Sequence, residues 1–335
     1  SFILAQPGEN CNKSAVLEVI KFMRYYFAPM EGITDAPYRR VHQSFFPGLT
    51  SYYMPFISPT IHRTLTHKED RELPMADSVD FCAIPQILTK VPEDFLWAAQ
   101  VCADRGYTEV NLNVGCPSGT VVSKGKGSGM LRSPAELDAF LEAIFKDSPL
   151  PISVKTRLGL ENPEDFVSLL EVFNRYPIKE LTIHPRVRKD FYKEPVREEW
   201  FRYAYENSKI PLCYNGNIMT KSQADAVSAQ YSGVDAVMIG RALIADPGML
   251  CGGTTAKALE GFLEELTEEY IREFGSARNA MFRLKENWGF LRHRFENSDK
   301  LWKQLRKTTD IHEYNAITAQ IRHTLPLTDG LNVEW

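Results

Sequence analysis

Eight short runs of β-branched and aromatic residues recur along the first three quarters of the chain. Each run ends at a polar residue or at a corner that contains glycine or proline, which is typical of buried β-strands in an alternating fold. The predicted strands are Tyr25–Ala28, Thr50–Met54, Cys82–Leu88, Glu109–Val114, Ile152–Thr156, Leu181–His184, Leu212–Asn215 and Ala236–Ile239.

Amphipathic segments with helix-start signals lie between most of these strands. Residues 92–105 begin with Pro-Glu-Asp and are followed by glycine, and residues 133–145 open with the capping box Ser-Pro-Ala-Glu. Residues 162–176 begin with Asn-Pro-Glu-Asp, and residues 220–230 form another unit. Proline and acidic residues favour the first turn of a helix, whereas glycine favours its end. Eight strands alternating with helices predict an α/β fold, a (β/α)8 TIM barrel with right-handed crossovers.

The pattern changes after Pro247, where strand signals stop and helical periodicity continues from about residue 256 to residue 323. This change predicts a C-terminal α-helical domain that follows the barrel. We divide the chain into residues 1–22, 23–252 and 253–335, with the second boundary near Gly252-Gly253. Residues 1–22 lack the charged start and apolar centre of a signal peptide. Because Met23 is a candidate start, we interpret them as a leader or an extension.

Composition narrows the class of protein. The 335 residues include 44% hydrophobic residues, and no apolar run approaches the roughly 20 residues that a membrane span needs. The six cysteines are scattered, without a CxxC pair or a zinc-ligand spacing, which indicates reduced thiols. We therefore expect a cytoplasmic monomer with no metal site and no membrane partner.

Charge is unevenly distributed along the chain. The formal net charge of −4 argues against a nucleic-acid-binding protein, but residues 271–323 contain 11 Lys or Arg against 6 Asp or Glu. A local excess of cations is more informative for RNA binding than the total charge. A solvated helical domain of mixed charge would give the same count, so charge alone leaves both interpretations open.

Polar residues close the predicted strands, and in a barrel such strand ends meet at the face that carries the active site. The loops after strands seven and eight, where barrels bind phosphates, contain Asn215-Gly216-Asn217 and Gly240-Arg241. Glycine lets backbone N–H groups approach a phosphate, and arginine adds a charged fork. Packing alone could also explain a glycine at either position, but the two loops together favour a phosphate site.

Three further strand-end residues are candidates for chemistry. Lys155 lies inside a strand, where a buried ammonium needs an anionic or polar acceptor, and the N1–C2=O2 edge of a reduced flavin would supply one. His184 is either a hydrogen-bonded core histidine or a cofactor contact. Cys116 is either a small buried hydrophobe or a reactive thiol, and its place on a stiff Gly-Cys-Pro corner favours the second.

Six motifs, in order, resemble those of the tRNA-dihydrouridine synthases of bacterial type, which are FMN-dependent enzymes that reduce uridines in RNA, typically in the tRNA D-loop. The resemblance runs from Met23 to about Pro247, and more loosely through the helical tail. The motifs are Ala28-Pro29-Met30-Glu31-Gly32-Ile33-Thr34-Asp35, Asn113-Val114-Gly115-Cys116-Pro117, Val154-Lys155-Thr156-Arg157-Leu158-Gly159, Ile183-His184-Pro185-Arg186, Asn215-Gly216-Asn217-Ile218 and Met238-Ile239-Gly240-Arg241.

The resemblance implies a role for each matching residue. Cys116 would be the proton donor and Asn113 would bind the uracil edge, while NADPH would reduce the flavin. The residues implied to hold FMN are Pro29, Met30, Glu31, Gln86, Lys155, His184, Asn215, Gly216, Asn217, Gly240 and Arg241. The residues assigned to RNA, together with Asn113, are Arg157, Arg186 and Tyr192, and Arg283 and Lys285 are assigned to it as cations of the basic helical tail.

The chain departs from the family pattern at three positions. Pro185 stands where the family often has glycine, Asn217 where it often has aspartate, and Asn111 where it often has an acidic residue. These departures weaken the contacts assigned to positions 185 and 217 but remove no reacting group. The alternatives are an FMN barrel of the dihydroorotate dehydrogenase or ene-reductase kind that acts on a small molecule, an RNA-binding module without redox chemistry, or ribosomal RNA in place of tRNA as the substrate.

Overall fold

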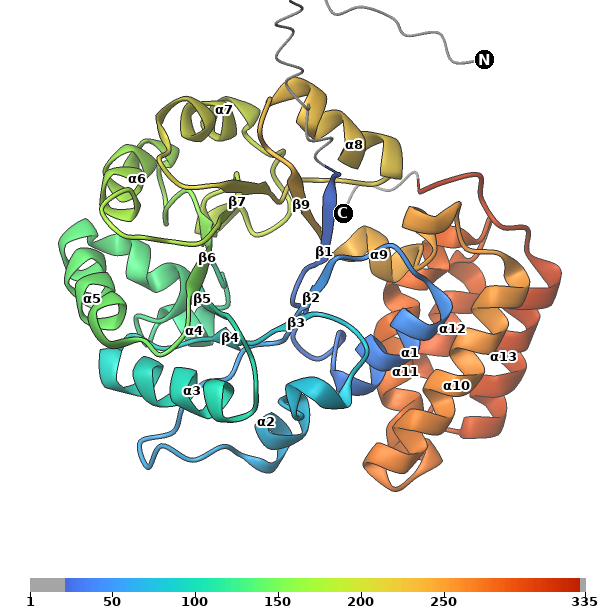
Figure 1. Ribbon diagram of the computed structural model, residues 1–335. Coiled ribbons are helices and arrows are strands. Elements are labelled where there is room, and N and C mark those ends of the chain that lie inside the picture. The colour runs from blue at the N-terminus through green and yellow to red at the C-terminus, as the bar shows by residue number, and fades with distance from the viewer. Residues whose placement is uncertain (1–21, 332–335) are drawn as a thin grey trace, which may run out of the picture.

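The computed structural model describes residues 22–331, and within that range nine parallel strands form a single sheet (Figure 1). Their order in the sheet is β3-β2-β1-β9-β8-β7-β6-β5-β4. The strands are β1 (Arg24–Phe27), β2 (Ser51–Tyr53), β3 (Ala83–Ile84), β4 (Gln86–Ile87), β5 (Val110–Val114), β6 (Ile152–Arg157), β7 (Leu181–His184), β8 (Leu212–Tyr214) and β9 (Ala236–Ile239).

The sheet closes on itself at Pro85, because β3 and β4 at the two ends of the strand order are consecutive in the chain. β3 pairs with β2, and β4 pairs with β5. The backbone N–H of Asn111 donates to the Pro85 carbonyl at 2.8 Å. Proline lacks an N–H group and interrupts the ladder on its donor side. The predicted third strand, residues 82–88, is therefore one barrel strand in two pieces, and the predicted eight-stranded TIM barrel is confirmed.

Helices surround the barrel, as Figure 1 shows. The predicted cap acts at Ser133, whose side chain accepts from the backbone N–H three residues later, and Thr220, for which no cap was predicted, does the same. Asn162 makes no such bond, and its segment begins with a 3₁₀ turn before α6. The barrel helices are α1 (Ala36–Phe45), α2 (His67–Glu72), α3 (Pro92–Asp104), α4 (Gly119–Val122), α5 (Pro134–Asp147), α6 (Phe166–Phe173), α7 (Glu198–Asn207), α8 (Lys221–Gln230) and α9 (Arg241–Ala245).

Four helices form the C-terminal part and lie beside α1 and α9 (Figure 1): α10 (Ala256–Phe274), α11 (Ala277–Leu291), α12 (Asp299–Lys307) and α13 (Ile311–Thr324). The ring of Phe262 on α10 meets Tyr38 edge-on, with centroids 5.6 Å apart, and Phe46 at 5.4 Å. Trp288 is fully buried, and its indole N–H donates to the Tyr314 hydroxyl at 3.0 Å. Helical side chains and barrel side chains thus belong to one hydrophobic core.

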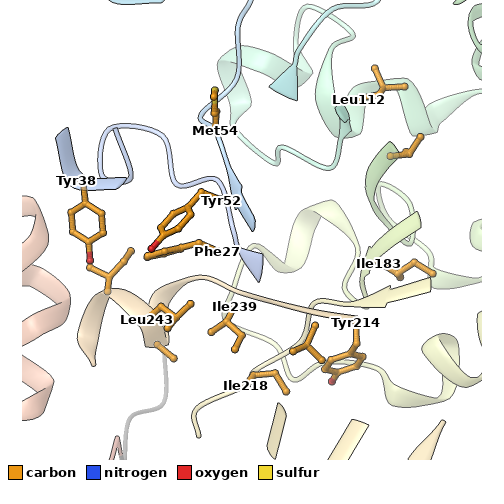
Figure 2. Packing of buried hydrophobic residues seen from close by; sticks show 14 of the residues in the cluster. Phe27, Tyr38, Tyr52, Met54, Leu112, Ile183, Tyr214, Ile218, Ile239 and Leu243 are labelled. Carbon is orange, nitrogen blue, oxygen red and sulfur yellow. The ribbon is translucent and has the colours of Figure 1, made fainter. Parts of the chain in front are cut away.

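Figure 2 shows part of this core, where Phe27, Tyr38 and Tyr52 lie close to Leu243 of α9. The chain leaves the barrel through Gly252 and Gly253, which both have positive φ, 97° and 93°. This left-handed backbone favours glycine and lies at the predicted boundary near residues 252 and 253. The division into a barrel domain and a helical domain stays a prediction, and the predicted extension, residues 1–22, lies outside the described residues except for Phe22. Across residues 22–331, no helix is long and apolar enough to cross a lipid bilayer.

Candidate functional site

Two adjoining pockets lie at the C-terminal ends of the strands, and the predicted strand-end residues line both. One pocket encloses about 530 Å³ and the other about 790 Å³ of space outside protein atoms, within the usual range for ligand sites. They share Pro29, Met30, Lys155, His184 and Tyr192. The first, the β8–β9 pocket, is completed by the loops after β8 and β9. The second, the cysteine pocket, contains Cys116.

Two glycines of the β8–β9 pocket lie in close contact with neighbouring side chains. A Cβ at Gly240 would lie 3.3 Å from the Ala28 Cβ and 3.4 Å from the Met30 sulfur, and one at Gly216 would overlap the Tyr214 hydroxyl. At Gly216 a side chain could not be accommodated unless Tyr214 moved. The two predicted glycines therefore leave room for Tyr214, Ala28 and Met30 to pack against the loops after β8 and β9.

Two guanidinium groups donate hydrogen bonds on the polar side of this pocket. Arg241 donates to the Asn217 side-chain oxygen at 3.1 Å, and Arg186 donates to the same oxygen at 3.2 Å. The Arg241 guanidinium also lies over the Tyr192 ring, 4.5 Å from its centroid. Burial lowers the pKa of Arg241 to about 10, with a further decrease from Arg186 and Arg157. Crowding of cations around one asparagine oxygen makes this an environment that favours an anion.

His184 is neutral in this setting. Burial lowers its pKa well below the usual value, and the surrounding cations, Arg157 and Lys155 among them, lower it further. Arg186 donates to His184 Nε2 at 3.0 Å, so this nitrogen is the acceptor and the imidazole proton is on Nδ1. His184 can therefore offer one N–H donor at Nδ1.

Lys155 is placed between the two pockets. Its ammonium donates to the Asn215 side-chain oxygen at 2.7 Å, and the amide of Asn215 donates to the Met238 carbonyl at 2.7 Å. Burial lowers the pKa of Lys155 to about 8, and Arg157 contributes in the same direction. A cation destabilised in this way would gain from an anionic partner in the cavity.

Hydrogen bonds between side chains and the backbone fix the corner that carries Cys116. The Asn113 side-chain oxygen accepts from the N–H groups of Gly115 and Cys116 at 3.1 and 2.9 Å. Ser128 donates to the Cys116 carbonyl at 2.8 Å, and Arg157 Nε donates to the Gly115 carbonyl at 3.0 Å. Burial raises the pKa of the Cys116 thiol. The thiol is therefore protonated at neutral pH and suited to donate a proton rather than to attack as a thiolate.

A chain of side-chain amides behind this corner was not predicted as a unit. Gln86 donates to Asn111 at 2.7 Å and accepts from Asn113 at 2.7 Å, while Asn111 donates to Ser153 at 2.9 Å. These hydrogen bonds determine which end of each side-chain amide is the oxygen. Asn111 and Asn113 are two residues apart on β5 and so point to the same face of the strand. That alternation is the sequence signal that would have identified Asn111.

The structure gives the residues assigned to RNA different environments. Asn113 and Tyr192 line the cysteine pocket, with Tyr192 38% exposed. Arg157 and Arg186 are buried, at 1% and 2% exposure, and bond to carbonyl groups inside the chain. Arg157 also lines the cysteine pocket, so it could meet a substrate only inside the cavity.

On the helical part, the two predicted RNA contacts already have partners. Arg283 donates to the Gly32 carbonyl and pairs with Asp35 at 3.4 Å, and Lys285 donates to the Thr308 carbonyl at 2.7 Å. Arg278, which was not singled out, is exposed and lies over the ring of Phe282, 5.8 Å from its centroid. Glu31 is exposed at the rim and forms an ion pair with Lys68. Within residues 22–331 no group of three or more His, Cys, Asp or Glu side chains could hold a metal ion.

Comparisons with known proteins place the chain among relatives. A family model described as dihydrouridine synthase (Dus) matches residues 26–328. The chain is 33% identical over 216 residues to tRNA-dihydrouridine synthase B of Proteus vulgaris, covering 64% of this chain and 66% of that protein. It is 28% identical over 283 residues to a probable tRNA-dihydrouridine synthase of Rhizobium leguminosarum bv. phaseoli, covering 81% and 86%.

Among solved structures, the chain is similar to a morphinone reductase mutant in complex with tetrahydroNAD. The TM-score is 0.49 at 12% identity, and the match covers 68% of this chain and 85% of that one.

Proposed function

Because the chain belongs to the dihydrouridine synthase family, we propose that it reduces the C5=C6 bond of specific uridines in tRNA to give 5,6-dihydrouridine. The observation that carries this proposal is the juxtaposition of a protonated thiol at Cys116 with a cation-rich pocket, both opening at the same end of the barrel. The printed names of the Proteus and Rhizobium relatives support tRNA as the RNA.

The β8–β9 pocket together with the adjoining cysteine pocket fits a flavin mononucleotide. Its phosphate would meet the Gly216 and Gly240 backbone and the Arg241 guanidinium, in the part of the pocket where cations crowd around Asn217. Lys155 would face the ring edge that gains negative charge on reduction, which would relieve the cost of burying this ammonium. The other residues that would line the flavin are Pro29, Met30, Glu31, Gln86, His184, Asn215 and Asn217. When bound, FMN supplies hydride transfer.

The chain's own residues would manage the proton and the base. Reduction of the C5=C6 bond adds a hydride at C6 and a proton at C5, and we assign the proton to Cys116. Its burial keeps the thiol protonated, and the amide of Asn113 holds its backbone in place. The second N–H of the Asn113 amide, beyond the one given to Gln86, would donate to the uracil edge.

A uridine in a folded tRNA must leave its stack to reach a pocket at the end of a barrel. Exposed cations would hold the phosphates on either side, and Arg278 on α11 is one exposed cation of the helical part. We propose NADPH as the reductant that restores the flavin, and the cytoplasm as the compartment where the enzyme meets tRNA.

The experiment that tests this proposal uses the purified full chain, NADPH and tRNA from cells that lack dihydrouridine. We expect flavin absorbance in the preparation, RNA-dependent oxidation of NADPH, and dihydrouridine in the tRNA by mass spectrometry. The Cys116→Ala variant should retain flavin and the first half-reaction but form dihydrouridine about 10²–10⁴-fold more slowly.

Cys82→Ala is the matched control, because Cys82 is also a free thiol but is exposed and does not line either pocket. This variant should behave like the parent. Parental rates of dihydrouridine formation in Cys116→Ala would refute the proton-donor assignment. A parent that binds no flavin and modifies no RNA would refute the function itself.

A further inference from the structure

The loop between β7 and α7 contains two consecutive aromatic residues, Phe191 and Tyr192, with opposite environments. Tyr192 lines both pockets, and its ring lies 5.9 Å from His184 and 4.5 Å from the Arg241 guanidinium. Phe191 lines neither pocket and is 39% exposed. A large apolar ring exposed to this degree beside a residue that lines a polar cavity gains less from burial than a core side chain does.

Phe191 also has a backbone conformation that side chains rarely adopt, with φ of 49° and ψ of −98°. The surrounding loop enforces it. Buried Asp190 pairs with Arg197 and accepts from the Val187 N–H at 3.0 Å, and the Arg188 N–H donates to the Gly159 carbonyl at 2.8 Å. Strained residues that rigid surroundings hold in place cluster at functional sites. The hydrogen bonds and the ion pair of this loop therefore fix the backbone that carries the Phe191 ring.

Arg188 connects this ring to the cysteine corner. Its guanidinium lies 5.2 Å from the centroid of the Phe191 ring, and its Nε donates to the Pro117 carbonyl at 3.2 Å. Pro117 follows Cys116 directly. The Arg188 side chain thus contacts the Phe191 ring and the Pro117 carbonyl at the same time. The Phe191 ring therefore lies within one side-chain length of the corner that carries the thiol.

We propose that Phe191 is a stacking platform for the nucleobase next to the uridine that enters the cysteine pocket, with Arg188 supporting the ring. This inference rests on the proposed function, because it requires an RNA whose target base has left its stack. A base that loses its stacked neighbour exposes an aromatic face, and stacking on an aromatic side chain compensates for that loss. The contact tolerates any base, since each has such a face.

The test compares parent, Phe191→Ala, Phe191→Trp and Phe191→Gly on an RNA that the parent modifies. Base stacking is worth about 1–3 kcal/mol, so Phe191→Ala should raise KM for RNA by about 5- to 150-fold with kcat nearly unchanged. Phe191→Trp keeps an aromatic face and should have a KM close to that of the parent. Phe191→Gly, which suits the left-handed backbone, should bind as weakly as Phe191→Ala. A parental KM in Phe191→Gly would assign the effect to the backbone and overturn the proposal.

A second arm changes the RNA. An abasic sugar is placed on the 5′ or the 3′ side of the target uridine, and KM is measured for parent and Phe191→Ala. With the abasic sugar on one of the two sides, Phe191→Ala should no longer raise KM relative to the parent, because the base that stacks on Phe191 has been removed. A penalty that persists with both abasic RNAs, or a parental KM in Phe191→Ala, would overturn the proposal.

Tyr205→Ala is the control. Tyr205 is 37% exposed on α7, where its ring packs against Tyr231 and lines neither pocket, and this variant should match the parent. Failure of the proposed function is distinguishable, because the parent itself would then form no dihydrouridine. Flavin absorbance of each variant shows that the cofactor site is intact.

Discussion

Asp35 is buried where the barrel meets the helical part, and replacing it with asparagine should change how stability depends on pH. Its carboxylate accepts from the Tyr38 N–H at 3.2 Å and from the Tyr270 hydroxyl at 2.9 Å, while its second oxygen has no hydrogen bond in the described structure. Burial raises the pKa of Asp35 to about 6, Glu72 raises it further, and Arg283 opposes the increase. Asparagine would keep both accepting bonds without a charge.

The sign and size follow from proton linkage. Between the unfolded pKa of 3.8 and the folded pKa of about 6, the folded state holds a proton that the unfolded state has lost. The contribution of Asp35 to the free energy of unfolding therefore falls as pH rises through this window, by up to about 3 kcal/mol at 1.36 kcal/mol per unit. Asp35→Asn lacks this loss, so the variant should gain stability relative to the parent as pH rises from 4 to 7.

Urea unfolding followed by tryptophan fluorescence at several pH values would measure the difference. Asp104→Asn on α3 is the control, since Asp104 is exposed and only accepts a bond from Gln100 at 2.8 Å. Its pH profile should run parallel to that of the parent. If the Asp35→Asn profile were also parallel to the parent's, the buried-carboxylate reasoning would be wrong.

Two further predictions concern the cofactor and the core. Arg241→Ala should lower the flavin-to-protein ratio after gel filtration, because a charge-assisted contact to the phosphate is lost; a ratio equal to that of the parent would contradict the phosphate assignment. Trp288→Ala should lower the free energy of unfolding by about 3–5 kcal/mol in urea titrations, because it leaves a large cavity and an unpaired Tyr314 hydroxyl; a loss below about 1 kcal/mol would mean that the helices repack around the gap.

Strand positions could be predicted because buried parallel strands are recognisable as short apolar runs. Leu181–His184 and Ala236–Ile239 have the predicted bounds, and β1 is shifted by one residue. The break at Pro85 follows from the missing N–H of proline and could have been inferred from the sequence. The position of the cavity was predictable for a related reason, since parallel strands end at the same face of a barrel.

Side-chain partners were less accessible from sequence. Arg157 and Arg186 were assigned to RNA, yet both bond to backbone carbonyls that the fold brings near. Nothing in the local sequence indicates which distant carbonyl an arginine will reach. The same applies to Lys285, whose partner carbonyl at Thr308 is 23 residues away. The roles of the individual site residues stay predictions.

The pairing of β1 with β9 determines when the barrel can close during synthesis. Arg24 is aligned with Ala236, so the first strand acquires its second neighbour only after 212 further residues (236 − 24) have been added. Until then β1 is an open sheet edge, and the face of α1 that Phe262 covers has no partner. A ribosome that adds about 5–20 residues per second leaves that edge uncovered for roughly 10–40 seconds. Pairing of both edges of β1 thus requires a strand more than 200 residues later in the chain, and an unpaired edge can pair with the wrong partner in the meantime.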